Sequence, residues 1–131
     1  MSDTLTLRVD LNSTVPAYRQ IVDELRILLV NGKLAPGSVL PSVRRMAVDL
    51  GVHFNTVAEA YRTLAEENWL DLQHGRGATV VKRNTPTADK AELVQEFRHR
   101  LRALVAEVRA AGASAVTIQA ELRELVDEVK L

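Results

Sequence analysis

The chain has 131 residues, of which 47% are hydrophobic, and this supports one compact core with an appendage but not two full domains. It contains no cysteine, which excludes a disulfide framework, a thiol nucleophile and a cysteine-ligated zinc ion. Its 17 basic residues balance 17 acidic ones, no apolar run approaches the roughly 20 residues that span a bilayer, and the N-terminus lacks a signal-peptide pattern, so we expect a cytoplasmic protein.

The first predicted helix runs from Pro16 to Asn31. Proline is tolerated at the first helical position because its missing N–H would lack a partner there in any case, and the Asn31-Gly32 pair is a stop signal. Apolar residues recur at helical spacing and predict the buried face of this helix: Tyr18, Ile21, Val22, Leu25, Leu28 and Leu29.

Two more helices are predicted, joined by a tight glycine turn. Ser42 is placed to cap the first of them, and Gly51 ends it because glycine adopts the left-handed conformation at little cost. The next helix starts at His53 or Asn55. The apolar stripes of the two helices are Val43, Met46, Ala47 and Leu50, then Val57, Ala60, Tyr61 and Leu64. The outer face of the later helix is polar: Asn55, Thr56, Glu59, Arg62 and Thr63. This arrangement is typical of a helix-turn-helix that presents its second helix to DNA.

Two short strands are predicted next, at Leu70–Gln73 and Ala78–Val81. They flank His74-Gly75-Arg76-Gly77, whose glycines around an arginine suit a tight hairpin. Three helices followed by a hairpin make a winged helix. Arg76 at the wing tip is then placed to enter a minor groove, or it is only a solvated hairpin tip.

The C-terminal third is predicted to be a helical hairpin. Residues 84–88 break the helical periodicity and predict a linker between the winged-helix domain at 1–83 and a helical hairpin for dimerisation at 89–131. Two helices with one apolar stripe each cover only part of that surface by folding on each other, so the rest needs a partner, most simply a second copy of the chain. A ligand pocket between the stripes is the alternative. The residues predicted to form a dimer interface are Leu101, Leu104, Val108, Leu122 and Leu125.

Several short motifs recur in one order between Val15 and about Arg83. They are Pro16-Ala17-Tyr18-Arg19-Gln20-Ile21, Asn31-Gly32-Lys33-Leu34-Ala35-Pro36-Gly37, Leu40-Pro41-Ser42-Val43-Arg44, Leu50-Gly51-Val52, Asn55-Thr56-Val57, Ala60-Tyr61 and Gly75-Arg76-Gly77. Together they resemble the DNA-binding domain of GntR-family bacterial transcription regulators, and a tail of only two helices is similar to the YtrA subfamily. Asn68 departs from the family pattern, because glycine is usual there.

The resemblance implies a winged helix-turn-helix, mainly α with a small β-hairpin wing, that binds double-stranded operator DNA with inverted half-sites as a homodimer. It implies contacts from Arg44 and from the Asn55-Thr56 end of the third helix, with the wing near the minor groove. The candidate DNA-binding residues taken from the patterns and the resemblance together are Ser42, Arg44, Arg45, His53, Asn55, Thr56, Arg62, His74, Gly75, Arg76 and Gly77.

Net charge gives this interpretation little support, because residues up to Pro86 include ten basic and nine acidic side chains. Their placement matters more: six basic residues cluster in the motif helices and the wing, namely Arg44, Arg45, Arg62, Arg76, Lys82 and Arg83. Arg45 has an equally simple interpretation as a surface charge, because it points elsewhere around the helix than Arg44.

No catalytic constellation is present, and His53, His74 and His99 lack metal-ligand spacing, so we expect neither an enzyme nor a cofactor or metal site. The sequence predicts a homodimeric repressor of its own operon, with a transport-related target suggested by the subfamily. An effector is left unassigned. The alternatives are a winged helix that binds a partner protein without reading DNA and, third, a subunit of a membrane transport system.

Overall fold

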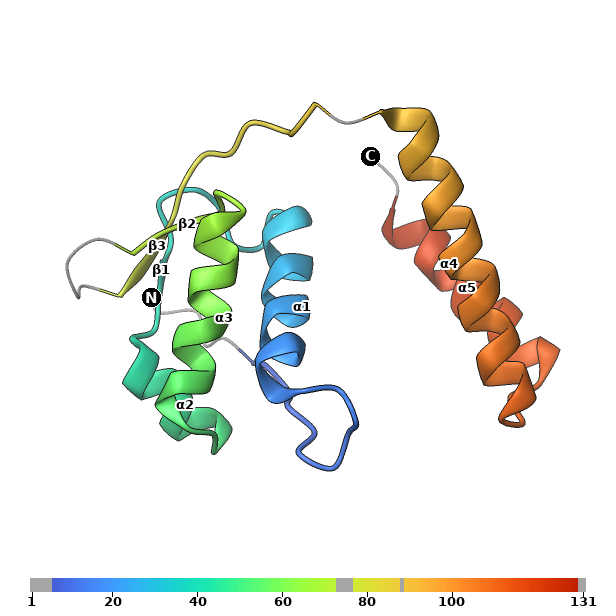
Figure 1. Cartoon of the computed structure of the whole chain (residues 1–131), viewed down its shortest axis with the longest axis horizontal. Helices are drawn as coiled ribbons and strands as arrows, with labels where there is room; N and C mark the ends of the chain where they lie inside the picture. Colours follow the sequence, from blue (N-terminus) through green and yellow to red (C-terminus); the bar gives the residue numbers. More distant parts are fainter. Residues whose placement is uncertain (1–5, 73–76, 88, 130–131) are drawn as a thin grey trace. The chain divides into compact units, whose positions relative to one another are not determined.

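The computed structural model describes residues 6–72, 77–87 and 89–129. The chain forms two compact units, Met1–Asn84 and Thr85–Leu131 (Figure 1). The first unit contains α1 (Ala17–Val30), β1 (Val39–Leu40), α2 (Val43–Leu50), α3 (Phe54–Glu66), β2 (Leu70–Asp71) and β3 (Ala78–Val80), and the second contains α4 (Lys90–Ala110) and α5 (Ala115–Glu128). The fold is mainly helical with a small sheet, as predicted.

The helix boundaries follow from local capping chemistry. The Ser42 hydroxyl accepts a hydrogen bond from the Arg45 N–H at 3.1 Å and caps α2, and Gly51 ends that helix with a φ of 69°. The first helix is shorter than predicted by one residue at each end. Pro16 caps it instead, since its carbonyl accepts the N–H groups of Arg19 and Gln20, and Asn31 lies at its other end.

The core of the N-terminal unit lies between its three helices and the sheet. The apolar stripe of α3 is entirely buried, as predicted, and in α1 and α2 the stripes are buried at their centres and half-buried at Tyr18, Leu28, Val43 and Leu50. The core residues are Ile21, Val22, Leu25, Leu29, Leu40, Met46, Ala47, Val57, Ala60, Tyr61, Leu64, Leu70, Ala78 and Val80.

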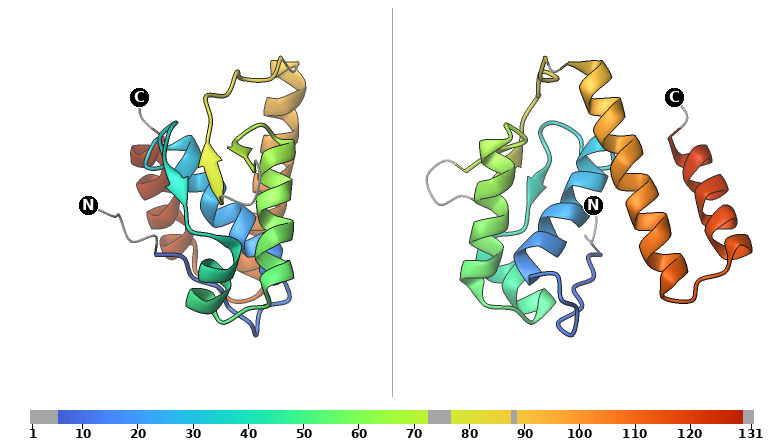
Figure 2. Two further views of the ribbon diagram at one scale, coloured as in Figure 1. Left: turned by 90° about the vertical axis from the view of Figure 1, so that its left-hand side faces the viewer. Right: turned by 45° about the vertical axis from the view of Figure 1, so that its right-hand side comes forward.

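The sheet has three antiparallel strands in the order β1-β3-β2 (Figure 2). Val39 and Leu40 pair with Thr79 and Ala78, and Leu70 pairs with Val80 on the other side of β3. The two predicted strands are present but shorter. The sequence did not predict β1, because two residues are too few to show an alternating pattern and the strand depends on β3 for its hydrogen bonds.

Asn68 links α3 to β2 in a left-handed conformation, with a φ of 68°. Its N–H donates to the Ala65 carbonyl and the Trp69 N–H donates to the Leu64 carbonyl, each at 3.0 Å, which is the Schellman pattern that usually ends on glycine. Asparagine tolerates this conformation better than other residues with a Cβ atom. The structure therefore explains why an asparagine can stand where the family that the sequence resembles usually has glycine.

Substitutions at Asn68 should report this backbone requirement. Asn68→Ala is expected to lower the free energy of unfolding by about 1 kcal/mol, because alanine gains nothing locally in the left-handed region. Asn68→Gly is expected to raise it by about 0.5 kcal/mol, since glycine lacks the steric penalty. Urea unfolding of the three proteins measures both changes, and a glycine variant less stable than the alanine variant would contradict the explanation.

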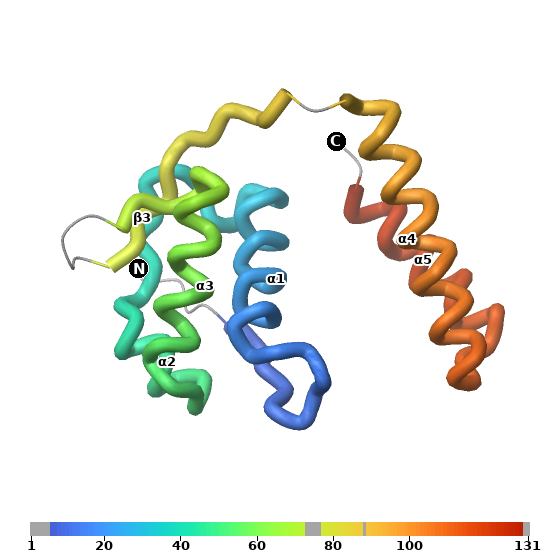
Figure 3. The backbone as a smooth tube through the Cα atoms, viewed as in Figure 1, coloured from blue at the N-terminus to red at the C-terminus, as the bar shows by residue number. Residues whose placement is uncertain are grey.

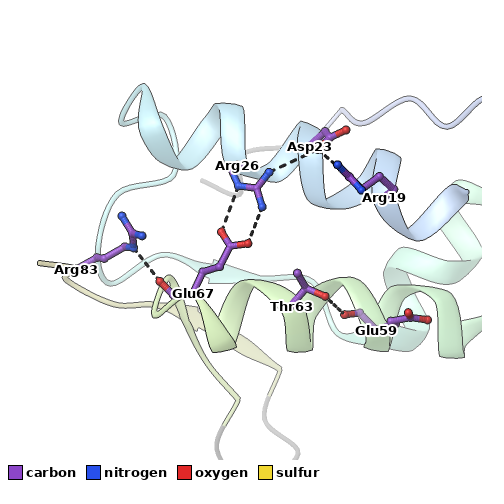
Figure 4. Close-up of polar contacts among 7 residues, drawn as sticks. All are labelled: Arg19, Asp23, Arg26, Glu59, Thr63, Glu67 and Arg83. Atoms are coloured by element: carbon purple, nitrogen blue, oxygen red, sulfur yellow. Dashed lines mark hydrogen bonds and ion pairs between the residues drawn. The ribbon is translucent and has the colours of Figure 1, made fainter. Parts of the chain in front are cut away.

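A polar network fixes the C-terminal end of α3 (Figure 4). Arg26 donates two hydrogen bonds to the Glu67 carboxylate, at 3.2 and 2.6 Å, and these raise the pKa of Arg26, so it stays charged. Arg83 donates to the Glu67 carbonyl at 2.8 Å, and its guanidinium lies 4.4 Å from the centre of the Trp69 ring. The end of α3 is thus tied to α1 and to the segment after β3.

The second unit is a helical hairpin, with α4 and α5 antiparallel in the right view of Figure 2. The Asp89 carboxylate caps α4 and the Ser114 hydroxyl caps α5. Neither helix contains a buried residue among those described, so the two apolar stripes do not close a core between them. Within the described chain, no helix is both long and apolar enough to cross a membrane.

A groove of about 480 Å³ lies between these two helices. All five predicted interface residues line it: Leu101, Leu104, Val108, Leu122 and Leu125. Leu101 and Leu122 are half-buried, whereas Leu104 and Leu125 remain 54% and 47% exposed. The hairpin therefore leaves a continuous apolar surface accessible.

Candidate nucleic-acid interface

The N-terminal end of α2 is held in place from the core. The Tyr61 hydroxyl donates a hydrogen bond of 2.7 Å to the Pro41 carbonyl, one residue before the Ser42 cap. Burial raises the pKa of Tyr61, so the hydroxyl stays protonated and remains a donor. Because Tyr61 belongs to α3, this bond connects the start of α2 to the helix that follows it in the helix-turn-helix.

Arg44 and Arg45 lie in the first turn of α2, and both are exposed. Arg45 pairs with Asp49 at 3.5 Å, one helical turn later, whereas within the described residues Arg44 makes no ion pair. An exposed ion pair of this kind contributes at most about 1 kcal/mol to the free energy of unfolding. Arg45 can therefore leave Asp49 for another anionic group. The geometry nevertheless agrees with the simpler interpretation of Arg45 as a surface charge.

The N-terminal end of α3 is capped by His53. Its Nδ1 atom accepts the Asn55 N–H at 3.1 Å, and its carbonyl accepts the Thr56 N–H at 3.0 Å. The bond from the Asn55 N–H uses one ring nitrogen of His53, so only the other nitrogen remains for an external contact. Asn55 is exposed and Thr56 is half-buried on the first turn, which places two polar side chains beside the cap.

Phe54 was not among the predicted site residues. It is the first residue of α3, and the residue is 47% exposed. The ring stacks on His53 with 4.7 Å between centroids, and the Arg44 guanidinium lies 6.0 Å from its centre. The sequence offered one signal that could have identified Phe54 as a site residue: it is an aromatic residue next to the polar face of the predicted helix. These contacts bring the starts of α2 and α3 together into one surface.

Two further basic side chains of the predicted cluster differ in their surroundings. Arg62 is exposed on α3, two turns after the cap, and is accessible to an anionic partner. Arg83 instead packs on Trp69 and binds the Glu67 carbonyl. We therefore assign it a structural role and remove it from the cluster of accessible charges.

The wing is described only in part. Figure 3 traces the chain through β2 and back along β3. Gly77 precedes β3 with a φ of 82°, a conformation that residues with a Cβ atom rarely adopt. The predicted residues His74, Gly75 and Arg76 lie outside the described residues.

The starts of the two helices form a surface suited to DNA. Free N–H groups and the helix dipole give each helix start a partial positive charge, and Arg44 adds a full one. Asn55 and Arg44 carry the amide and guanidinium groups that read base edges. Among the described residues, no cluster of histidine and carboxylate side chains could hold a metal ion.

The comparison with known proteins points the same way. A family model described as "Bacterial regulatory proteins, gntR family" matches residues 17–80. The chain is 29% identical to the HTH-type transcriptional repressor YtrA of Bacillus subtilis over 95% of both chains. It is 38% identical to the HTH-type transcriptional regulator Rv1152 of Mycobacterium tuberculosis, over 75% of this chain and 81% of that one.

A solved structure is similar along nearly the whole chain. It is YtrA from Sulfolobus acidocaldarius, a GntR-family transcription factor, at 33% identity and a TM-score of 0.54, over 94% of this chain and 98% of that one. These three relatives are named as transcription regulators and not as enzymes. The family match, the similarity along the chain and the winged helix-turn-helix agree: the chain belongs to the GntR family of bacterial regulatory proteins.

Proposed function

We propose that this chain is a sequence-specific DNA-binding repressor that acts as a homodimer on an operator with inverted half-sites. The observation that carries the proposal is the shared surface at the starts of α2 and α3, where Arg44, Asn55 and Thr56 lie beside the His53 cap. Repression is proposed from the similarity to Bacillus subtilis YtrA, which is named as a repressor.

The charge pattern of α2 supports a role in binding an anion. Its first turn carries two arginines and no acidic residue, the reverse of what the helix dipole favours. Such an arrangement costs a few tenths of a kcal/mol in the free protein, and DNA phosphates would relieve it. The placement of Arg44 is therefore easier to explain by DNA binding than by stability.

We propose two roles for the candidate DNA-binding side chains, base contacts and phosphate contacts. Arg44 can donate two hydrogen bonds to the O6 and N7 atoms of guanine, and Asn55 can pair with the N6 and N7 atoms of adenine. Arg62 lies further along α3, where a phosphate contact is the simpler role. We assign Ser42, Arg45 and His53 to the same surface as positioning or phosphate-contacting residues. From the sequence, we keep the wing residues His74, Gly75, Arg76 and Gly77 as proposed DNA contacts near the minor groove.

The hairpin supplies the proposed dimer contact. Its groove is mostly apolar, although Glu121, Glu124 and Glu128 also line it. Leu104 and Leu125 are about half exposed, so each would contribute about 0.8 to 1.5 kcal/mol if buried, half of the value for a fully exposed side chain. The two helices also have opposite charge, with five basic and three acidic residues in α4, and one basic and four acidic residues in α5. A second copy that sets its α5 against α4 would match both features, whereas an effector would have to use the same groove.

The regulated genes are proposed from the same relationship. We propose that the protein represses its own operon, and that this operon has a transport-related function. Deletion of the gene, followed by measurement of transcripts from its own operon, tests this point. Higher transcript levels in the deletion strain are expected, and unchanged levels would contradict autoregulation.

Fluorescence anisotropy separates DNA readout from a protein-binding winged helix. The labelled duplex is the DNA upstream of the gene, and the competitor is a scrambled duplex of equal length, titrated over a salt series. We expect tight binding of the upstream DNA that weakens with salt, with a preference over the scrambled duplex at each salt concentration. Equal affinity for the two duplexes, or no binding, would favour the protein-binding module.

Arg62→Ala is expected to weaken binding to both duplexes by the same factor. A phosphate contact carries no sequence information, so its loss lowers overall affinity without changing the preference for the operator. The slope of log affinity against log salt should become less steep by about 0.9, the value for one phosphate. A variant that lost preference for the operator would instead make Arg62 a base-contacting residue.

A further inference from the structure

Phe54 is the apolar side chain of α3 that stays outside the core. The other large apolar residues of this helix, Val57, Tyr61 and Leu64, are at most 1% exposed, whereas Phe54 is 47% exposed. It also lies at the first helical position, next to the polar side chains that we propose read bases. Burial in the core therefore does not explain why an aromatic ring stands at this position.

The ring is held in place before any partner binds. It stacks on His53 at 4.7 Å, with 27° between the ring planes, and His53 is itself fixed through its cap bond to Asn55. The Arg44 guanidinium lies 6.0 Å from the ring centre. A side chain restrained in this way loses little conformational freedom when it contacts a ligand.

The chemistry of the major groove offers this ring one matching group. Phenylalanine has no hydrogen-bonding atom, so it cannot read the donors and acceptors of the base edges. The C5-methyl group of thymine is the apolar feature of the groove, and phenylalanine is among the side chains that contact it. We propose that Phe54 is a specificity-determining residue that reads a thymine methyl group in the operator; this inference rests on the proposed function.

The position of that thymine follows from the contact with Arg44. The guanidinium and the ring centre are 6.0 Å apart, and successive base pairs are about 3.4 Å apart along DNA. A guanine bound by Arg44 and a thymine touched by Phe54 therefore lie within about two base pairs of each other. Each half-site of the operator is expected to contain such a pair.

The test changes one methyl group of the DNA and leaves the protein intact. The full-length chain is first used to select its preferred duplex from a random library, and each thymine of the selected site is then replaced singly by deoxyuridine. We expect one substitution per half-site to weaken binding about fourfold, the factor for losing one buried methyl group. In Phe54→Ala the same substitution should have no effect.

Two further variants complete the design. Phe54→Leu keeps an apolar contact and should retain most of the sensitivity to deoxyuridine. Ile27→Ala removes a side chain of α1 that is 60% exposed, and it should behave as the wild type. Circular dichroism spectra of the variants serve as the control for folding.

The outcomes separate this inference from the function on which it rests. Failure of the wild type to select any sequence would overturn the proposed function. A selected site at which every deoxyuridine substitution changes affinity less than twofold would leave that function intact and overturn the role of Phe54. An effect of equal size in the wild type and in Phe54→Ala would also overturn it, because another residue would then read the methyl group.

Discussion

Removal of residues 88–131 is expected to give a monomeric winged helix with operator affinity lower by orders of magnitude. Two recognition helices must lie about 34 Å apart to enter successive major grooves, and one copy of the chain has only one. Linking the two binding events also raises the effective concentration of the second to the millimolar range. Among the residues that the structure describes, the buried core lies in the N-terminal unit, so we expect the shortened chain to fold.

A point variant in the full-length chain tests the same interface without truncation. Leu104→Glu places a charge in the groove and is expected to dissociate the dimer, because the carboxylate would lose its hydration on burial. Val116→Glu is the matched control, since Val116 is 76% exposed and does not line the groove. Sedimentation velocity measures the association state. A truncated chain that remains dimeric, or a full-length chain that is monomeric at micromolar concentration, would place the interface elsewhere.

Arg44→Ala is expected to weaken operator binding by about 1 to 3 kcal/mol, the value for one specific base contact. Stability should be unchanged or slightly higher, because a positive charge is removed from the start of a helix. This combination distinguishes a binding residue from a structural one. Anisotropy titration and urea unfolding of the same protein sample measure the two effects.

The controls for Arg44 separate charge from geometry. Arg44→Lys keeps the charge but cannot form two parallel hydrogen bonds with guanine, so it should recover overall affinity only in part and with weaker sequence preference. Arg19→Ala removes an exposed arginine from α1, which lies outside the proposed surface, and should leave binding unchanged. An Arg44→Ala variant that binds the operator as tightly as the wild type would contradict the assignment.

The helices could be predicted because their limits are set by neighbouring residues. The cap at Ser42, the left-handed Gly51 and the apolar spacing of Val57 and Leu64 all act within a few residues. The sequence therefore identified three helices, a hairpin and a helical tail. The Schellman geometry at Asn68 likewise explains a departure from the family pattern that the sequence alone showed only as an unusual residue.

The features that the sequence did not predict depend on contacts between distant residues. Strand β1 exists because β3 pairs with it. Arg83 looked like a surface charge, but it packs on Trp69 and binds the carbonyl of Glu67, 16 residues away. Phe54 was not predicted as a site residue, because its relation to Arg44 appears only when α2 and α3 are brought together.

A hydroxyl-radical footprint on the DNA upstream of the gene tests the central claim most directly. The account predicts two protected patches with inverted sequence symmetry, centred about one turn of DNA apart on one face of the duplex. Both patches should disappear together on deletion of residues 88–131, at concentrations that give full protection by the intact chain. Three results would contradict the claim that this chain binds its operator as a dimer: a single protected patch, protection without symmetry, or no protection at the highest protein concentration used.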